Sequence, residues 1–217
     1  MIQEHDPKWL RWLDQHFSWM AIPNLAIVLV ALQGIGFVLL QNDPSGLERM
    51  VLLPDHIYQG EIWRLFSFLA IPVAHSPIQL VFSLLFSYFI INSIESEWGE
   101  VKTTFYVLTS ILLMVAFALI FDHPVTQISD FYSSLFLAAA ALFPEQEIRI
   151  YFFIPVKLKV LGWLAIAFIL YRLIQCEWKD RFFLLVIYSN YLLFFGPTIL
   201  YRFKNWKRKR DFQKKYR

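Results

Sequence analysis

TTFYVLTSILLMVAFALIF, residues 103–121, contains no charged side chain. A run of about 18 or more apolar residues matches the hydrocarbon thickness of a bilayer and is longer than a buried globular helix needs. Residues 22–40 and 182–201 are also free of charge over a comparable length. Of the 217 residues, 58% are hydrophobic and 17% are charged, and the mean hydropathy is +0.49. This composition excludes an ordinary soluble domain and predicts an integral membrane protein.

Three less regular segments extend the prediction to six membrane spans. Residues 65–94 carry no charge, but prolines interrupt the first third, so the helix is expected to begin near Ser76. The segment 128–142 is short; Asp130, Ser134, Ala138 and Ala141 share one helical stripe and Ser129 and Ser133 the neighbouring one, which predicts a closely packed central helix. Residues 160–174 contain Arg172, which is expected to extend to the interface from near the helix end.

The predicted fold class is an all-α membrane protein, a bundle of six transmembrane helices preceded by an interfacial amphipathic helix. Residues 1–20 form the surface helix in this prediction, residues 21–201 the bundle, and residues 202–217 a basic cytoplasmic tail. The tail has nine basic residues and one acidic residue, which fits a topology determinant or attraction to anionic lipid. Nucleic acid is not an expected partner of a segment tethered to a bilayer.

Basic residues determine the predicted orientation, because they are retained on the cytoplasmic side of span ends. Fifteen of the twenty lie in the N-terminal segment, in two alternate loops and in the tail, so both termini are predicted to be cytoplasmic. Several tryptophans near span ends are expected at the headgroup level, namely Trp19, Trp63, Trp98, Trp163 and Trp178.

Cys176 is the single cysteine, which rules out an intrachain disulfide and a thiolate metal cluster. No residue pattern predicts a cofactor or a metal site, and none indicates an oligomeric state. The lipid bilayer is the first partner that the sequence predicts.

Short motifs then follow one another in a recognisable order. They are QGEIWRLFSF at residues 59–68 with Pro72 and His75 after it, Glu95 followed by Trp98 and Gly99, LFP at residues 142–144, and FFIPVK at residues 152–157. In this order the chain resembles the rhomboid superfamily over residues 58–174. The resemblance implies a six-helix fold around a shorter fourth helix, used in active members as an intramembrane serine protease. The FFIPVK stretch looks more like bacterial members, which predicts a bacterial cytoplasmic (inner) membrane.

Active rhomboids carry a GxSG motif on the fourth span, a histidine on the sixth, and a histidine and an asparagine on the second that stabilise the oxyanion. The resemblance places the nucleophile at Ser129, where the motif has become QISD at residues 127–130. It places the two second-span positions at Gln79 and Ser83. All five histidines of the chain precede Ser129, and Asn190 on the sixth span does not titrate, so the general base of the family has no counterpart.

Three functions are open at this point. The first is a rhomboid-like pseudoprotease that binds transmembrane segments of client proteins, with Asn190, Ser129, Asp130 and Gln79 lining one polar pocket. The second is an active intramembrane serine endopeptidase that uses Ser129 with a non-standard base, Asp130 or His123. The third is a small transporter with Asp130 as its intramembrane carboxylate.

The motif residues also have simpler structural interpretations. Trp63 and Arg64 are expected to anchor the first loop, with Arg64 reaching loop carbonyls or headgroup phosphates. Asn190 is expected to satisfy the backbone of a neighbouring helix. Glu95, which precedes the turn at Gly99, is expected to face cytoplasmic water.

Overall fold

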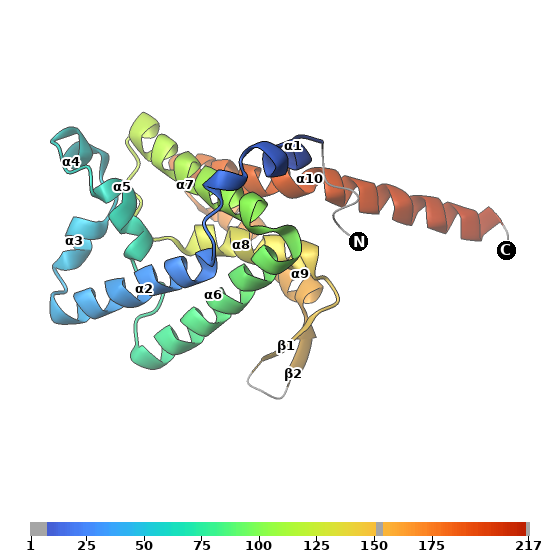
Figure 1. The fold of residues 1–217 in the computed structure, drawn as a ribbon, viewed down its shortest axis with the longest axis horizontal. Coiled ribbons are helices and arrows are strands. Elements are labelled where there is room, and N and C mark those ends of the chain that lie inside the picture. Colours follow the sequence, from blue (N-terminus) through green and yellow to red (C-terminus); the bar gives the residue numbers. More distant parts are fainter. Residues whose placement is uncertain (1–7, 151–153, 216–217) are drawn as a thin grey trace.

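The computed structural model describes residues 8–150 and 154–215 (Figure 1). Its long helices are α2 (Leu25–Asn42), α6 (Pro77–Trp98), α7 (Glu100–Phe121), α8 (Ser129–Leu142), α9 (Leu158–Gln175) and α10 (Trp178–Lys215). The shorter elements are α1 (Lys8–His16), η2 (Ser18–Met20), α3 (Gly46–Met50), α4 (Pro54–Tyr58), α5 (Arg64–Ser67), η3 (Phe68–Ala70), β1 (Glu147–Ile150) and β2 (Ile154–Lys157). Residues 1–7 of the predicted surface helix, residues 152–153 of the FFIPVK stretch and residues 216–217 of the tail lie outside the described residues.

Four helical segments among the described residues are long and apolar enough to cross a membrane: Ser18–Asn42, α6, α7 and α9. The helix α8 is apolar but has only 14 residues. The prediction that the second long apolar segment becomes helical near Ser76 is confirmed, because α6 begins at Pro77 and the hydroxyl of Ser76 accepts the backbone N–H of Gln79. Proline is favoured at the first helical position since it has no N–H to leave unpaired.

Small residues place α8 at the centre of the bundle. Ser134, Ala138, Ala139 and Ala140 are all buried, and α8 packs against α6, α9 and α10. The helix α2 lies on the outer side of α6, while α7 packs on α10. Short side chains allow neighbouring helices to approach closely without a large apolar seam, so the prediction of a closely packed fourth helix is confirmed.

The bundle has two different ends (Figure 1). The loop end carries α3, α4, α5, residues 122–128 and the turn between α9 and α10. The hairpin end carries α1, the turn between α6 and α7, the hairpin β1–β2 and the second half of α10. Because the two termini both lie at the hairpin end, the described helices place them on one side of the bundle.

The hairpin is a departure from the predicted all-α fold. Strands β1 and β2 are antiparallel, with Glu147 opposite Lys157. This register draws two lysines toward Glu145, whose carboxylate accepts from the ammonium of Lys157 at 2.9 Å and from that of Lys159 at 2.5 Å. The hairpin therefore joins the end of α8 to the start of α9 through charged contacts at its base.

The N-terminal helix α1 packs on the bundle rather than only on a membrane surface. Leu10 is fully buried, and the ring of Trp9 meets that of Phe194 on α10 edge-on at 5.1 Å. Asp14 lies 3.6 Å from the buried ammonium of Lys102 on α7. The predicted tail has no boundary in the described residues, since α10 continues as one helix to Lys215.

Candidate functional site

Ser129, the predicted nucleophile position, is the first residue of α8 and is partly buried. It lines a cavity of about 340 Å³ at the loop end, together with Gln127, Thr126 and His75. Phe37 and other apolar residues of α2 and of the loop before α6 form the other wall. The cavity therefore brings a hydroxyl and an imidazole to the same opening, between α2 and α8.

Asp130, the next residue, faces a different neighbour. Its carboxylate accepts two hydrogen bonds from the guanidinium of Arg172 on α9, at 2.5 Å and 3.3 Å, and a weaker one from the hydroxyl of Tyr188 on α10 at 3.4 Å. Arg172 was expected to extend to the interface, and the structure adds a partner that the sequence did not indicate, because a buried Asp130 without the guanidinium would be costly. This contact ties α9 and α10 to α8.

A second cavity of about 340 Å³ lies beside this ion pair, again at the loop end. Its wall includes Asp130, Arg172, Cys176, Asp180 and His123. His123 lies 3.6 Å from the carboxylate of Asp180, and burial lowers the pKa of the imidazole while the nearby carboxylate opposes that shift. His123 is therefore oriented toward Asp180 on α10, and it lines a different cavity from the one that Ser129 lines.

Gln79 and Ser83, the second-span positions, line a wide groove between α6 and α9. The groove has a volume of about 870 Å³, and its wall is apolar except for these two side chains. The apolar wall consists of Phe82, Phe86, Phe136, Ile148, Leu161, Leu164, Ala165 and Phe168. Each polar side chain has a local hydrogen bond: the amide oxygen of Gln79 accepts the N–H of His75 at 3.1 Å, and the hydroxyl of Ser83 donates to the carbonyl of Leu80 at 2.9 Å.

Asn190 is buried between α10 and α7, with two donors and an acceptor all satisfied. Its amide donates to the carbonyl of Tyr106 at 3.0 Å and to the hydroxyl of Ser110 at 2.7 Å, and its oxygen accepts from Thr109 at 3.0 Å. Tyr106 in turn bonds through its hydroxyl to Ser134 on α8. The interpretation of Asn190 as a partner for a neighbouring helix backbone agrees with these contacts.

The structure thus separates residues that the sequence grouped into one polar pocket. Ser129 opens toward α2, Asp130 pairs with α9, Gln79 faces the groove between α6 and α9, and Asn190 is bonded to α7. Adjacent helical residues point about 100° apart, so Ser129 and Asp130 cannot face one opening. The single pocket predicted from sequence is not formed by the described residues.

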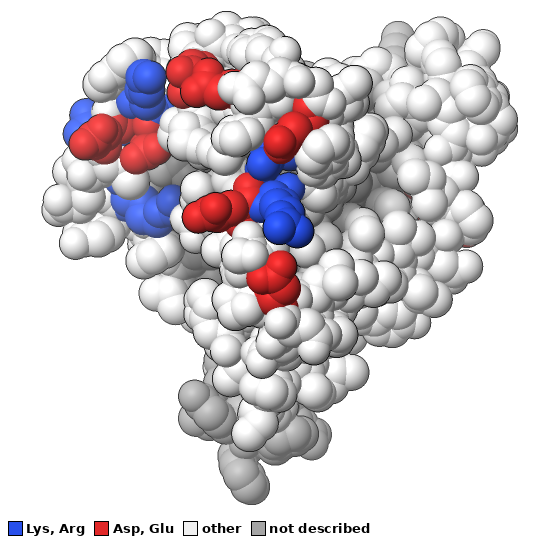
Figure 2. Space-filling model, turned by 90° about the vertical axis from the view of Figure 1, so that its left-hand side faces the viewer, with Lys and Arg blue, Asp and Glu red and all other residues white. Residues whose placement is uncertain are grey.

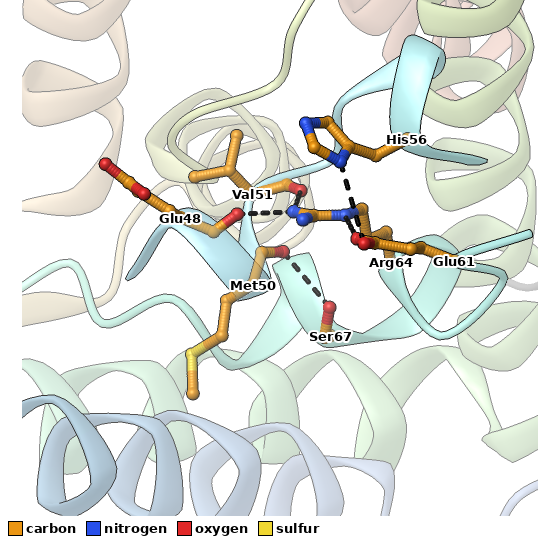
Figure 3. A network of polar contacts seen from close by, with 7 residues as sticks. All are labelled: Glu48, Met50, Val51, His56, Glu61, Arg64 and Ser67. Carbon is orange, nitrogen blue, oxygen red and sulfur yellow. Dashed lines mark hydrogen bonds and ion pairs between the residues drawn. The ribbon is translucent and has the colours of Figure 1, made fainter. Parts of the chain in front are cut away.

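The first loop is held by Arg64, the second residue of the WR pair (Figure 3). Its side chain is 5% exposed, donates to the carboxylate of Glu61 at 2.5 Å and reaches the carbonyls of Glu48 and of Val51, the latter at 2.9 Å. A guanidinium has five donors in a fixed fork, which suits it to collect carbonyls from several turns. Of the two roles expected for Arg64, the structure shows the contact with loop carbonyls, while Trp63 is exposed at the loop end.

Glu61 is the charged partner in this network. The hydrogen bond from Arg64 lowers the pKa of its carboxyl group, with a smaller contribution from His56, 3.6 Å away. Figure 2 shows the loop end directly, with acidic and basic side chains interspersed over part of it and uncharged surface around them. The exposed loop surface therefore carries charges of both signs. By contrast, the charged residues of the C-terminal segment 202–217 are nearly all basic.

Two contacts between α2 and the loop before α6 were missed in the sequence, because their signals are single residues inside an apolar run. The amide of Gln33 in α2 donates to the carbonyls of Leu69 and Ile71, both at 2.8 Å, and its oxygen accepts the N–H of Val73 at 3.1 Å. At Gly36, a Cβ would lie 1.7 Å from the carbonyl oxygen of Ala70. A glutamine and a glycine three residues apart share one helical face, and that spacing was the available signal for a close backbone contact.

At the hairpin end, the expectation that Glu95 faces water is wrong. Glu95 is buried, and its carboxylate accepts the backbone N–H of Leu25 at 3.2 Å, which satisfies an unpaired donor in the first turn of α2. Trp98, the last residue of α6, is also buried, against Tyr106 and Phe195. Gly99 adopts a φ of +97°, which L-residues with a side chain rarely occupy, and so reverses the chain between α6 and α7.

Among the residues that the structure describes, no group of three or more His, Cys, Asp or Glu side chains is placed to hold a metal ion.

Comparison with known proteins bears on the type of membrane. A family model described as "Eukaryotic integral membrane protein (DUF1751)" matches residues 24–195. No curated protein and no solved structure matches the chain. The expected integral membrane character is confirmed by this family, and the predicted bacterial cytoplasmic membrane is wrong, because the family is eukaryotic. The FFIPVK stretch misled because a short hairpin sequence carries little information about the organism.

Proposed function

The chain belongs to the DUF1751 family of eukaryotic integral membrane proteins, and we propose that it is a rhomboid-like pseudoprotease with six membrane spans. In this proposal it binds transmembrane segments of other membrane proteins without cleaving them. The short α8 is the fourth span and the apolar first part of α10 the sixth, and the four long apolar segments are the other spans. Both termini face the cytoplasm, which agrees with the excess of basic residues at the hairpin end.

The groove between α6 and α9 is the observation that supports binding of a helix. It is open and about 870 Å³ in volume, and most of its wall consists of phenylalanine and leucine side chains. Leu164 and Phe168 project from α9, while Phe82 and Phe86 project from α6. A client helix placed here would exchange lipid contacts for packing contacts, which drive helix association within a bilayer.

Gln79 gives the groove a polar position at its loop end. The amide oxygen of Gln79 is bonded to the N–H of His75, and an amide NH₂ carries two donors of its own. A client helix with a carbonyl or hydroxyl at that depth would find a donor where the bilayer offers none. Client selection in this proposal thus combines apolar packing with one polar match.

The charged contacts at α8 support binding without cleavage. Serine needs an adjacent base to become a nucleophile. The carboxylate of Asp130 is hydrogen-bonded to Arg172, and His123 lies beside Asp180 in the neighbouring cavity. Neither of these two side chains lines the cavity of Ser129, and His75, which does, makes no hydrogen bond to Ser129 among the described residues.

Photo-crosslinking from inside the groove tests the binding proposal. A photoreactive amino acid replaces Leu164 in the groove, and the same change at Leu112 on α7 is the matched control, since the two side chains are 66% and 68% exposed. We expect membrane-protein adducts from position 164 that position 112 does not form. Equal adducts from both positions would contradict the proposal, because they would reflect lipid exposure alone.

A separate measurement tests the absence of cleavage. The purified protein in liposomes is treated with a fluorophosphonate probe and with a model transmembrane substrate, and wild type is compared with Ser129→Ala. We expect no labelling and no cleavage in either protein. Labelling of wild type that Ser129→Ala abolishes would favour the intramembrane endopeptidase instead.

A further inference from the structure

The segment of residues 122–128, between α7 and α8, forms a wall of both cavities at the loop end. Thr126 and Gln127 line the cavity of Ser129, and they also line the second cavity, beside the ion pair of α8 and α9. The segment therefore separates two cavities of about 340 Å³ each. Its attachment to the rest of the bundle keeps the two cavities apart.

Backbone hydrogen bonds fasten this segment on either side of Pro124. After it, Val125 pairs with Leu52 of the first loop through hydrogen bonds of 3.0 Å and 3.2 Å. Before it, the backbone N–H of His123 donates to the carbonyl of Ala118 on α7 at 3.0 Å. Backbone amides do not titrate, so these contacts are insensitive to pH. The attachment at His123, however, continues through a side chain that does titrate.

The imidazole of His123 lies between aromatic rings of α7 and α10. Its centroid is 5.6 Å from that of Phe117, with the two ring planes at 80°, and 4.9 Å from that of Phe183. The side chain is 13% exposed, and its Nε2 lies 3.6 Å from the carboxylate of Asp180 on α10. This distance is too long for a hydrogen bond. The neutral ring is therefore held mainly by packing on the two phenylalanines.

A charge on this ring is disfavoured in the folded protein. Burial lowers the pKa of His123, the carboxylate of Asp180 opposes the shift, and Lys179 adds to it. Below the ordinary pKa of 6.5, protonation favours arrangements in which the ring has left its place between the phenylalanines. The packed arrangement is fully stable above that pH and loses stability as the pH falls below it.

The elements around His123 carry other titratable and charged side chains. They are Tyr58 on α4, Asp122 in the segment itself, Asp130 on α8, Arg172 and Cys176 on α9, and Lys179, Asp180 and Arg181 on α10. Among side-chain types, histidine is the one whose ordinary pKa places its change of charge between about pH 5 and pH 8. A change of pH within this range therefore acts on the cluster through His123.

We propose that His123 is a pH-sensitive latch: its neutral ring, packed between Phe117 and Phe183, holds residues 122–128 on the bundle, and protonation releases them and opens the cavity beside Asp180. The loop end faces away from the cytoplasm in the orientation given above, where histidine switches respond to mildly acidic compartments. That placement rests on the proposed function, whereas the latch itself does not. The latch couples the pH on that side of the membrane to the accessibility of the loop-end cavities.

Hydrogen exchange of the purified full-length protein in nanodiscs tests the latch. Peptides that cover residues 119–128 are compared at about pH 7.5 and about pH 5.5, on either side of the ordinary pKa of histidine. Each rate is divided by the intrinsic exchange rate at the same pH, because the chemical step itself depends on pH. We expect protection to fall severalfold at the lower pH, and unchanged protection would overturn the proposal.

A pair of matched variants assigns this loss of protection to one side chain. His123→Phe keeps an aromatic ring without a titrating group and should remove the loss. His75→Phe is the same change in the cavity of Ser129, at the same end of the bundle, and should keep it. A loss of the same size in His123→Phe would overturn the proposal.

Neighbouring charges on α10 should change the loss of protection in opposite directions. Asp180→Asn removes the group that favours the protonated ring, so the loss should become larger. Lys179→Gln removes a group that disfavours it, so the loss should become smaller. Lys179 is exposed and the side chain of Asp180 is 48% exposed, so both variants are expected to fold. Changes of the reverse sign would contradict the electrostatic cause.

Cys176 reports on the opening itself, because the single cysteine of the chain lines the cavity beside Asp180. Its rate of reaction with dithiodipyridine is measured relative to that of a model peptide thiol at the same pH. We expect this ratio to rise at the lower pH in wild type and in His75→Phe, but not in His123→Phe. A constant ratio in wild type would overturn the opening of the cavity. Neither measurement uses a client, so its outcome is separate from that of crosslinking in the groove.

Discussion

The two walls of the groove are attached to the bundle in different ways. The wall formed by α6 is fixed to α2, which is held in turn by the Gln33 hydrogen bonds, by the close contact at Gly36 and by Glu95. The wall formed by α9 is held within the membrane by the pair Asp130–Arg172 and the contact at Gly162, and at its start by the hairpin. Because α9 is held within the bundle by a partly exposed ion pair and one contact between small residues, α9 is the wall that we expect to yield to a client.

The largest expected loss of stability concerns the α6 wall of the groove, which is fixed to α2. Gly36→Ala places a methyl group where the carbonyl of Ala70 lies, at 1.7 Å, so α2 must move away from η3. We expect a loss of about 3 kcal/mol in the free energy of unfolding, measured by titration with sodium dodecyl sulfate. Gly34→Ala is the matched control: its Cβ would meet only a methyl group of Leu84 at 3.8 Å, and helix propensity predicts a gain of up to about 1 kcal/mol. If the two variants had the same free energy of unfolding, the contact between α2 and Ala70 would not be a rigid one.

The next largest loss of stability is expected at the α9 wall, which the pair Asp130–Arg172 holds. Arg172→Met leaves the buried carboxylate of Asp130 without its main partner, and we expect a loss of about 2 kcal/mol, less than for a fully buried pair because Arg172 is partly exposed. Adding Asp130→Asn should restore most of the stability, since it removes the unpaired charge. The same unfolding titration measures both. A double variant as unstable as Arg172→Met would show that the ion pair itself, not the buried charge, accounts for the loss.

A smaller effect is expected at the hairpin end of the fixed wall. Glu95→Ala removes the acceptor for the N–H of Leu25, and loss of such a contact at a helix N-terminus costs about 1 kcal/mol. Glu95→Gln keeps an acceptor oxygen and should recover about half of that loss. Hydrogen exchange at the first turn of α2 should report the difference directly. Slow exchange in the alanine variant would contradict a capping role.

The smallest effect concerns the charged base of the hairpin at the start of α9. Hydrogen bonds from Lys159 and Lys157 lower the pKa of Glu145 to about 2 from its ordinary value of 4.5. A depressed carboxyl pKa stabilises the folded state above the ordinary value, and this contribution is lost as the pH falls from about 4.5 toward about 2. Exchange of the hairpin amides should therefore increase over that interval in wild type. Glu145→Gln should show no such step, and a step that persists in it would assign the effect to another group.

Helix positions were predictable because they follow from local properties of the chain. Pro77 and Ser76 mark the start of α6, and small residues mark α8, as the sequence indicated. The contacts of Gln33 and Gly36 were not predictable in the same way. A glutamine in an apolar run shows only that it needs a partner, and the partner, the loop around Ile71, lies on a different element.

The sequence by itself determined that this chain enters a membrane and where most of its helices lie, because the length of apolar runs and the placement of charge are properties of neighbouring residues. The tertiary structure decided which polar groups meet. Asp130 and Arg172 are 42 residues apart, and Leu25 and Glu95 are 70 residues apart. Several partners for each were compatible with the sequence, and only helix packing brings one of them within hydrogen-bond distance. Helix packing also places the residues of the one predicted polar pocket in different parts of the structure.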